Sequence, residues 1–355
     1  MPPRTAGLSS ACWTRTSRYS IATPERVTVL SLRRHTPLLT LSLTLAIASL
    51  ALALRLGSTD IPSAEVWAHV IADDGSINDR IIDQLRLPRA LTAFAVGGLL
   101  ALAGALIQVL LRNPLGDPYV LGVSGGASTA VLSAMLLGAP VFWYAPAAGA
   151  GALLSTLLVF GLARSGEDWR SERLLLTGIV VAAGWSALIS FVLSISPAAR
   201  LPGMLFWLMG DLADADRPGL PFIVLGAALL YCLLRARDLN IATQGLLQAA
   251  ALGVNTGRLR LELYFISAVL TAVAVTAAGA VGFVGLVTPH LVRRAGGRDH
   301  RVLLPASVLL GGSLLVFADT LARTLVSPMQ LPVGVLTALI GVPVFLFLLR
   351  RRSVA

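Results

Sequence analysis

The sequence predicts an all-α, polytopic membrane protein with about ten transmembrane helices. Of its 355 residues, 56% are hydrophobic and only 13% are charged, whereas a soluble domain carries about 25% charged residues. Apolar runs long enough to cross the bilayer as helices recur along the chain, a crossing that takes about 20 residues. These runs are continuous rather than alternating, which excludes a transmembrane β-barrel.

Stretches without charge mark the spans in order. Residues 1–34 hold six arginines and no apolar run, and we expect them to form a disordered cytoplasmic tail. The run that follows has no evident cleavage site, so we interpret it as a helix of the mature protein. Residues 35–350 then form a single transmembrane domain. The predicted spans are 35–54, 90–111, two within 118–163 divided near residue 138, 174–199, 218–234, two within 263–292 divided by glycines, 302–319, and 331–349.

One uncharged stretch, residues 239–257, is rich in Thr, Gln, Asn and Gly and would make an eleventh span if it crossed the membrane. The distribution of arginine decides against this. With ten spans and the N-terminus inside, cytoplasmic segments hold 21 arginines and external segments hold seven. Because basic residues favour the cytoplasmic side, we expect both termini and residues 239–257 to be cytoplasmic.

The second span combines membrane length with residues that weaken a helix in water. Gly97, Ala101 and Ala105 follow the spacing at which small residues let helices approach closely in lipid. Gln108 is expected to face the bundle or a translocation path, because lipid would leave its amide without a partner. Gly97 and Gly104 are expected to serve packing or the same path.

Charged residues at the outer ends of spans are the other unusual feature. Arg86, Arg89 and Arg323 lie outside although the positive-inside rule disfavours arginine there. Asp319 is the one acid placed within a span, so it should face the bundle and be paired. Arg323 is four residues further on, at the spacing of an ion pair along one helix.

The composition also limits the chemistry. All 28 basic residues are arginine, so the chain lacks the lysine that a P-loop ATPase needs. The two cysteines and four histidines are scattered, so we expect no metal site, no cofactor and no catalytic residues. The expected surroundings are lipid, and no nucleic-acid partner is expected. A secondary transporter driven by an ion gradient is the alternative from another class, but it would need more buried charge.

Several motifs, in order along residues 40–350, resemble the FecCD-type permeases of ABC importers for iron chelates, haem and vitamin B12. The resemblance is carried by these stretches: "RLPR" at 86–89, "RNPLGDPYVLGVSGGAS" at 112–128, "LLLTGI" at 174–179, "FWLMGDL" at 206–212, "AAALG" at 249–253, "GFVGLVTPHLVRRAGGRDHRVLLP" at 282–305, "ADTLAR" at 318–323 and "LPVGVLTALIGVPVFLFLL" at 331–349. Gln330 departs from the family, which usually has Glu before the Leu-Pro pair. The long N-terminal tail is a second departure.

The resemblance implies a type II ABC importer permease in the cytoplasmic (inner) membrane. The implied partners are a second permease subunit (homo- or heterodimer), two cytoplasmic ATPase subunits and an external solute-binding protein. The resemblance implies docking of the binding protein on Arg86, Arg89 and Arg323. It leaves the chelate open between ferric siderophore, cobalamin and haem, and frequency within the family favours the siderophore.

The polar segment 240–257 is then the expected contact with the ATPase, with a solvated loop as the alternative. Asn240 is expected to cap the start of a helix and Gly253 to end it, and Gly245 could divide it into two shorter helices. The implied coupling residues are Ala250, Ala251, Leu252 and Gly253.

Overall fold

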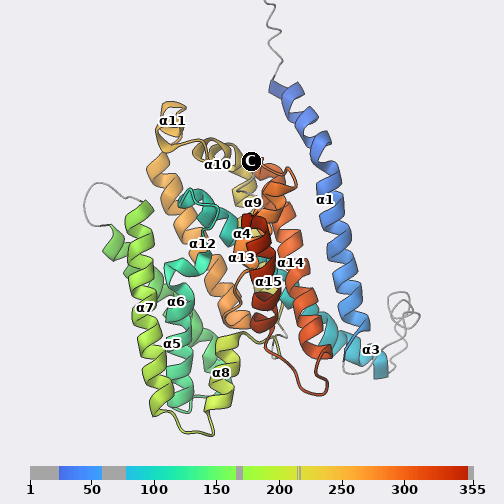
Figure 1. The fold of residues 1–355 in the computed structure, drawn as a ribbon, viewed down its shortest axis with the longest axis vertical. Helices are drawn as coiled ribbons and strands as arrows, with labels where there is room; N and C mark the ends of the chain where they lie inside the picture. Colours follow the sequence, from blue (N-terminus) through green and yellow to red (C-terminus); the bar gives the residue numbers. More distant parts are fainter. Residues whose placement is uncertain (1–23, 58–76, 165–170, 214, 216, 351–355) are drawn as a thin grey trace, which may run out of the picture.

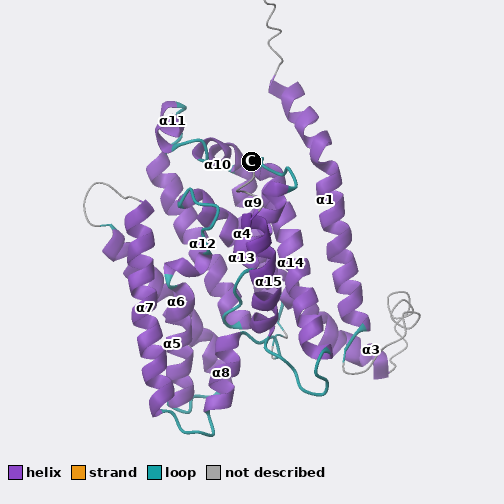
Figure 2. Cartoon of the chain, viewed as in Figure 1, coloured by secondary structure: helices purple, strands orange, loops and turns teal. Residues whose placement is uncertain are grey.

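The computed structural model describes residues 24–57, 77–164, 171–213, 215 and 217–350, and within these ranges the chain is helical with no strand (Figures 1 and 2). The longer helices are α1 (Pro24–Arg55), α4 (Leu87–Leu110), α5 (Val123–Leu136), α6 (Tyr144–Ala163), α7 (Ser171–Ile195), α9 (Gly219–Leu234), α12 (Thr256–Ala278), α13 (Val284–Arg294), α14 (His300–Thr324) and α15 (Val333–Arg350). The shorter ones are α3 (Ile77–Ile81), α8 (Leu201–Met209), α10 (Ala236–Ala242) and α11 (Leu246–Ala251), and single turns cover Ile82–Arg86, Pro118–Leu121 and Val141–Trp143.

Each of the ten predicted spans coincides with one of the ten longer helices, which confirms the fold class. Six helices in the described residues are long and apolar enough to cross a membrane unaided. A seventh candidate is α9 taken together with α10, which are bent by 66° where they meet. Helices α5 and α15 are apolar but shorter, and α13 has 11 residues. The short α13 follows the glycine-rich break that the sequence predicted after α12.

Helix α4 forms the centre of the bundle. In the most apolar 18-residue stretch of Asp79–Leu110, 89% of the residues are buried. Helices α14, α12, α13 and α9 pack around α4. Its sequence is apolar on all sides, as expected for a helix surrounded by other helices. By contrast, only 11% of the residues in the most apolar 18-residue stretch of α7 are buried. A helix so exposed must meet lipid or another subunit.

Glycines set the close helix contacts around α4. A Cβ at Gly97 would collide with the carbonyl oxygen of Gly311 in α14, and a Cβ at Gly104 would collide with that of Gly285 in α13. A Cβ at Gly311 would in turn lie 2.5 Å from that of Ala101. The small-residue spacing of the second span therefore packs backbone against backbone, as such spacing does in membranes.

The connections divide the bundle into two ends. The start of α1, the C-terminal end of α15, α10 and α11 lie together at one end, which we call the termini end (Figure 1). The α5–α6 turn, α8, α3 and the loop 325–332 lie at the other, which we call the distal end. The start of α1 and the end of α15 therefore lie at the same end of the bundle, an arrangement that ten spans would produce.

Three boundaries differ from the prediction. Helix α1 begins at Pro24, so residues 24–34 of the predicted disordered tail are helical. Proline suits the first turn of a helix, and no glycine or proline interrupts the next ten residues. The prediction missed this part because it used the apolar run, which covers only the later part of α1. Residues 1–23 lie outside the described residues. Helical structure also starts well before residue 90, at Ile77, and α8 was not predicted as a separate helix.

Candidate docking cluster and coupling segment

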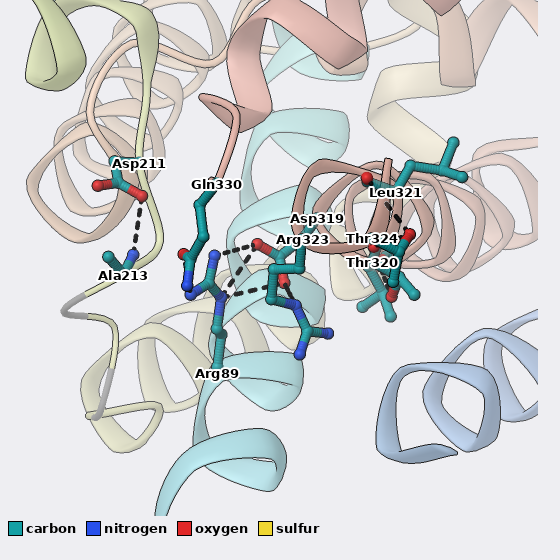
Figure 3. Close-up of polar contacts among 10 residues, drawn as sticks. Arg89, Asp211, Ala213, Asp319, Thr320, Leu321, Arg323, Thr324 and Gln330 are labelled. Atoms are coloured by element: carbon teal, nitrogen blue, oxygen red, sulfur yellow. Dashed lines mark hydrogen bonds and ion pairs between the residues drawn. The ribbon is translucent and has the colours of Figure 1, made fainter. Parts of the chain in front are cut away.

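At the distal end, α4 and α14 bring two arginines onto one carboxylate (Figure 3). Arg89 Nη2 lies 2.8 Å from Asp319 Oδ1, and Arg89 Nε lies 3.1 Å from the same oxygen. Arg323 Nε lies 3.1 Å from Asp319 Oδ2. Arg89 Nη1 also donates to Gln330 Oε1 at 3.1 Å. We call Arg89, Asp319, Arg323 and Gln330 the arginine cluster.

Burial makes these contacts stronger than ordinary surface pairs. The side chain of Asp319 is 1% exposed, that of Arg89 is 11% exposed and that of Arg323 is 9% exposed. An ionised carboxylate at this depth needs a counter-charge, and Arg89 offers its planar fork to both oxygens. The expected pairing of Asp319 with Arg323 along α14 is confirmed. Its pairing with Arg89, 230 residues away in sequence, was not predicted.

Arg86, the third predicted docking residue, is placed differently. Its side chain is 4% exposed, and Nη1 donates to the carbonyl oxygens of Leu54 and Arg55 at 2.7 and 2.8 Å. These two residues end α1, where the last carbonyls have no partner within the helix. In this geometry Arg86 joins α1 to the start of the second span, rather than projecting from the surface as the sequence led us to expect.

Gln108 lies near the termini end of α4 and is 5% exposed. Its Nε2 is 3.4 Å from the carbonyl oxygens of Gly285 and Leu286, and within the described residues its buried Oε1 has no hydrogen-bond partner. Together with the Gly104–Gly285 contact, this places Gln108 at the packed contact between α4 and α13.

At the termini end, residues 240–257 hold the end of α10, all of α11 and the first residues of α12. Gly245 lies between α10 and α11, so the segment is divided there, as the sequence allowed. The end of α11 is closed by two backbone hydrogen bonds: Gly253 N donates to Ala250 O at 3.0 Å, and Val254 N donates to Ala249 O at 2.9 Å. Gly253 has φ of +82°, the left-handed conformation that this helix end requires and that glycine adopts without strain.

The exposed surface of α11 is mostly apolar, with Gln248 as its polar member. Leu247 is 90% exposed and Leu252 is 62% exposed, and Ala250, Ala251 and Gly253 are exposed beside them. Ala249 is fully buried and holds the helix on the bundle. We call residues 246–253 the coupling segment. An outward row of apolar side chains at the end of a membrane bundle suits a groove of a partner protein.

The prediction that Asn240 caps a helix start is wrong. Asn240 lies in the last turn of α10, where Nδ2 donates to Asp299 Oδ1 at 2.9 Å and Oδ1 accepts from the backbone N of His300 at 2.9 Å. Asp299 is the N-cap of α14 and accepts from Arg301 N. The amide of Asn240 therefore connects α10 to the start of α14. Asn240 cannot cap a helix start because α10 already begins at Ala236.

Ion pairs connect the same region to α12. Arg235 lies 2.8 Å from Asp238 and 3.1 Å from Glu262, and Arg258 lies 2.9 Å from Glu262. These groups border a cavity of about 440 Å³ next to the coupling segment. The lining residues are Tyr231, Arg235, Asp238, Gly253, Val254, Asn255, Arg258 and Glu262. Two basic and two acidic side chains balance in charge here, and the described residues hold no cluster that could bind a metal ion.

Comparison with known proteins identifies the family. The profile of the FecCD transport family matches residues 45–351. The chain belongs to this family. It is a permease subunit of the ABC importer type, as the motifs predicted.

Three relatives illustrate the likeness. The permease is 43% identical to the cobalamin import system permease protein BtuC of Halobacterium salinarum, over 77% of this chain and 74% of the relative. It is 42% identical to the hemin transport system permease protein HmuU of Yersinia pestis, over 76% and 82% of the two chains. A solved inward-facing structure described as a metal-chelate type ABC transporter is similar with a TM-score of 0.79 and 32% identity, over 88% of this chain and 98% of that chain.

Proposed function

We propose that the permease passes a bulky metal chelate across the cytoplasmic membrane, after delivery by a solute-binding protein and with energy from ATP hydrolysed by partner subunits. The placement of the two candidate sites is the observation that carries this proposal. The arginine cluster lies where α4 begins and α14 ends, and the exposed apolar side chains of the coupling segment belong to α11, which lies at the opposite end of the bundle (Figure 1). An importer that needs one partner on each side of the membrane requires such an arrangement.

The termini end is proposed to be cytoplasmic. Most of the arginines belong to segments at that end, in agreement with the positive-inside rule. The coupling segment would then meet the ATPase, with Ala250, Ala251, Leu252 and Gly253 as the contact residues. The lack of lysine in the chain supports a separate ATPase, since a P-loop needs that residue.

The distal end is proposed to receive the solute-binding protein. Arg89 and Arg323 supply positive charge there, and charge complementarity sets the register of two docking surfaces. Arg86 would contribute by holding α1 against the second span, because its guanidinium is occupied by the carbonyls of Leu54 and Arg55. Its direct contact with the binding protein remains a prediction from the family resemblance.

A second permease subunit is proposed to pack on α7. The exposed face of this helix carries small and weakly polar residues in a row: Ala183, Ser186, Ala187, Ser190 and Ser194. The serine hydroxyls donate to backbone carbonyls within the helix, Ser186 to Ala182 O and Ser190 to Ser186 O. Small residues of this kind favour helix contacts over lipid contacts. Facing copies of α7 would border a path of neutral, weakly polar character that suits a bulky chelate.

For the substrate we propose a metal-bound tetrapyrrole. The relatives described above are named for cobalamin and hemin, at 43% and 42% identity, and these two names support a tetrapyrrole over the ferric siderophore expected from frequency within the family. The choice between cobalamin and haem depends on the binding protein, which presents the chelate.

Reconstitution tests the function directly. The permease, its ATPase and its solute-binding protein are placed in liposomes, and uptake of cyanocobalamin, hemin and ferrichrome is measured with and without ATP. We expect saturable, ATP-dependent uptake of one tetrapyrrole and none of ferrichrome. Uptake of ferrichrome alone would contradict the proposed substrate. Uptake that needs only an ion gradient, without the ATPase, would contradict the proposed mechanism.

A further inference from the structure

The coupling segment is joined to the bundle through α10, which lies between two breaks in the chain. At Arg235, α9 and α10 meet with a bend of 66°. Beyond α10, Gly245 has φ of +141°, a conformation that favours glycine, and α11 follows it. A helix of seven residues is marginal on its own. Contacts with neighbouring helices must therefore set the position of α10.

Asn240 makes such a contact with both ends of its amide. Nδ2 donates to Asp299 Oδ1 at 2.9 Å, and Oδ1 accepts from His300 N at 2.9 Å. Because an ionised carboxylate only accepts and a backbone N–H only donates, the amide fits in one orientation. His300 Nδ1 lies 2.6 Å from the same Oδ1, so this ring nitrogen must carry the hydrogen. We call Asn240, Asp299 and His300 the α10–α14 junction.

The start of α14 depends on this junction. The first N–H groups of a helix have no partner within it, and here Asn240 supplies the acceptor for that of His300. His300 is 2% exposed, and its Nε2 is buried without a hydrogen-bond partner among the residues that the structure describes. Asn240 thus also orients the ring. Removing an acceptor from buried donors costs more than the hydrogen bonds themselves contribute, so α10 and α14 are held together firmly.

Helix α14 extends the junction across the bundle. It runs from His300 at the termini end to Thr324 at the distal end (Figure 1), and 72% of the residues in its most apolar 18-residue stretch are buried. A Cβ at Gly311 would lie 2.5 Å from the carbonyl oxygen of Gly97 in α4. Helices packed this closely move as units, because packed cores shift between discrete arrangements and do not deform continuously. A displacement of α10 would therefore reach α14 and the central helix.

We propose that Asn240 is a positioning residue for transport: through Asp299 and His300 it passes movement of the coupling segment to α14 while the ATPase hydrolyses ATP. This role rests on the proposed function, in which the coupling segment meets the ATPase. It adds the side chain by which that contact reaches the membrane helices. Without the junction, the energy of ATP hydrolysis is converted less well into uptake.

Asn240→Asp tests the junction with almost no change of shape. The new carboxylate removes a donor and faces Asp299, so two negative charges meet where a hydrogen bond was. Each permease is purified together with its ATPase and reconstituted with the solute-binding protein. Uptake of the substrate and hydrolysis of ATP are then measured in the same liposomes and expressed as uptake per ATP. The thermal midpoint of each complex is measured in parallel.

Asn113→Asp is the matched control. It makes the same change of side chain at the same end of the bundle, where α4 ends. Asn113 Oδ1 accepts from Leu115 N at 2.9 Å, and aspartate keeps this acceptor. The control therefore adds the charge without breaking a contact between helices.

A rescue variant combines Asn240→Asp with Asp299→Asn. The amide and the carboxylate then exchange places, so a donor again faces an acceptor across the junction. Asparagine serves as well as aspartate before the first residue of a helix, so α14 can still begin at His300. A merely structural effect on folding would change the thermal midpoint without changing uptake per ATP.

We expect Asn240→Asp to lower uptake per ATP about tenfold, within the range of coupling between two sites of a protein. Asn113→Asp should stay within about twofold of the wild type, since its hydrogen bond is kept. The exchange of amide and carboxylate should recover about half of the wild-type ratio or more, because it restores the hydrogen bond but not the original cap of α14.

The outcomes separate the failures. Wild-type uptake per ATP in Asn240→Asp would overturn the role of Asn240, even if the thermal midpoint falls. An equal loss in Asn113→Asp would overturn it too, because added charge would then explain the effect. So would an exchange variant that recovers no uptake per ATP. Wild-type uptake that needs no ATPase would contradict the proposed function, and the role of Asn240 with it.

Discussion

The two ends of the bundle present different kinds of surface. At the distal end, the candidate contact is made of charged side chains that are buried and paired, with Asp319 1% exposed between two arginines. At the termini end, the coupling segment exposes apolar side chains, with Leu247 90% exposed, and its shape depends on a backbone turn at Gly253. Recognition at the distal end should therefore depend on charge and salt. Recognition at the termini end should depend on shape and apolar contact.

The difference follows from how each group is held. Arg89 and Arg323 keep their positions because Asp319 binds both, so the distal surface is organised by side chains from α4 and α14. The coupling segment is organised by backbone hydrogen bonds at the end of α11 and by the fully buried Ala249. A single substitution should disturb the first through electrostatics and the second through backbone conformation.

The largest expected effect concerns the sidedness of the two ends. Single cysteines replace Leu247 or Met329 in a chain that carries Cys12→Ser and Cys232→Ala, and intact cells are treated with a membrane-impermeant maleimide. With the termini end in the cytoplasm, as proposed, position 329 should be labelled from outside, and position 247 only after the cells are opened. Labelling of position 247 in intact cells would reverse the orientation and remove the coupling segment from contact with the ATPase.

Gly253 offers the next largest effect, on coupling. A β-branched residue in the left-handed conformation is strained by roughly 1–2 kcal/mol, and φ is +82° here. Gly253→Val should reduce transport and transport-coupled ATP hydrolysis by about tenfold or more while the permease still inserts. Gly253→Asn should retain most activity, because asparagine tolerates this conformation.

The matched control for Gly253 is Gly296→Val. Gly296 also has positive φ, +97°, and at both glycines a Cβ would meet no atom within 4 Å. If Gly296→Val impairs coupling as much as Gly253→Val, backbone strain at this end of the bundle explains the loss, and the coupling segment has no special role. Equal losses in Gly253→Val and Gly253→Asn would assign the effect to side-chain bulk at the ATPase contact.

The last comparison concerns stability, and it sets a buried ion pair at the distal end against an exposed one at the termini end. Arg89→Gln should lower the free energy of unfolding by about 3 kcal/mol, because it removes one partner of a buried carboxylate. Arg258→Gln removes an exposed pair with Glu262, in which Arg258 is 75% exposed, and should cost about 0.3–0.5 kcal/mol.

Chemical unfolding of the purified permease in detergent measures both changes. Arg89→Gln combined with Asp319→Asn should cost less than the two single changes added together, since each removes the same contact. Additive costs would show that Arg89 and Asp319 stabilise the permease independently.

Much of the fold could be predicted because membrane insertion depends on local properties. Charge-free runs located all ten longer helices, and the glycines at 279, 282 and 285 marked the break between α12 and α13. Asp319 was expected to be paired because a lone carboxylate in a span is costly. Its contact with Arg89 could not be predicted, because it depends on how α4 and α14 lie against each other. The prediction that Asn240 caps a helix was wrong for the same reason, because its hydrogen-bond partners lie at the start of α14.

The sequence alone predicted the ten longer helices and the family, and both are confirmed. The side of the membrane on which each loop lies and the partner that hydrolyses ATP stay predictions. The hydropathy of a segment, the preference of arginine for the cytoplasmic side and the residue types present are properties of single residues or short segments. They can therefore be evaluated without a structure. Only the tertiary structure decided that Arg86 closes the end of α1, that Gly97 and Gly104 pack backbone against backbone, and that the arginine cluster has one positive charge in excess. These properties depend on which side chains meet across helices, and that is set by the packing of the whole bundle.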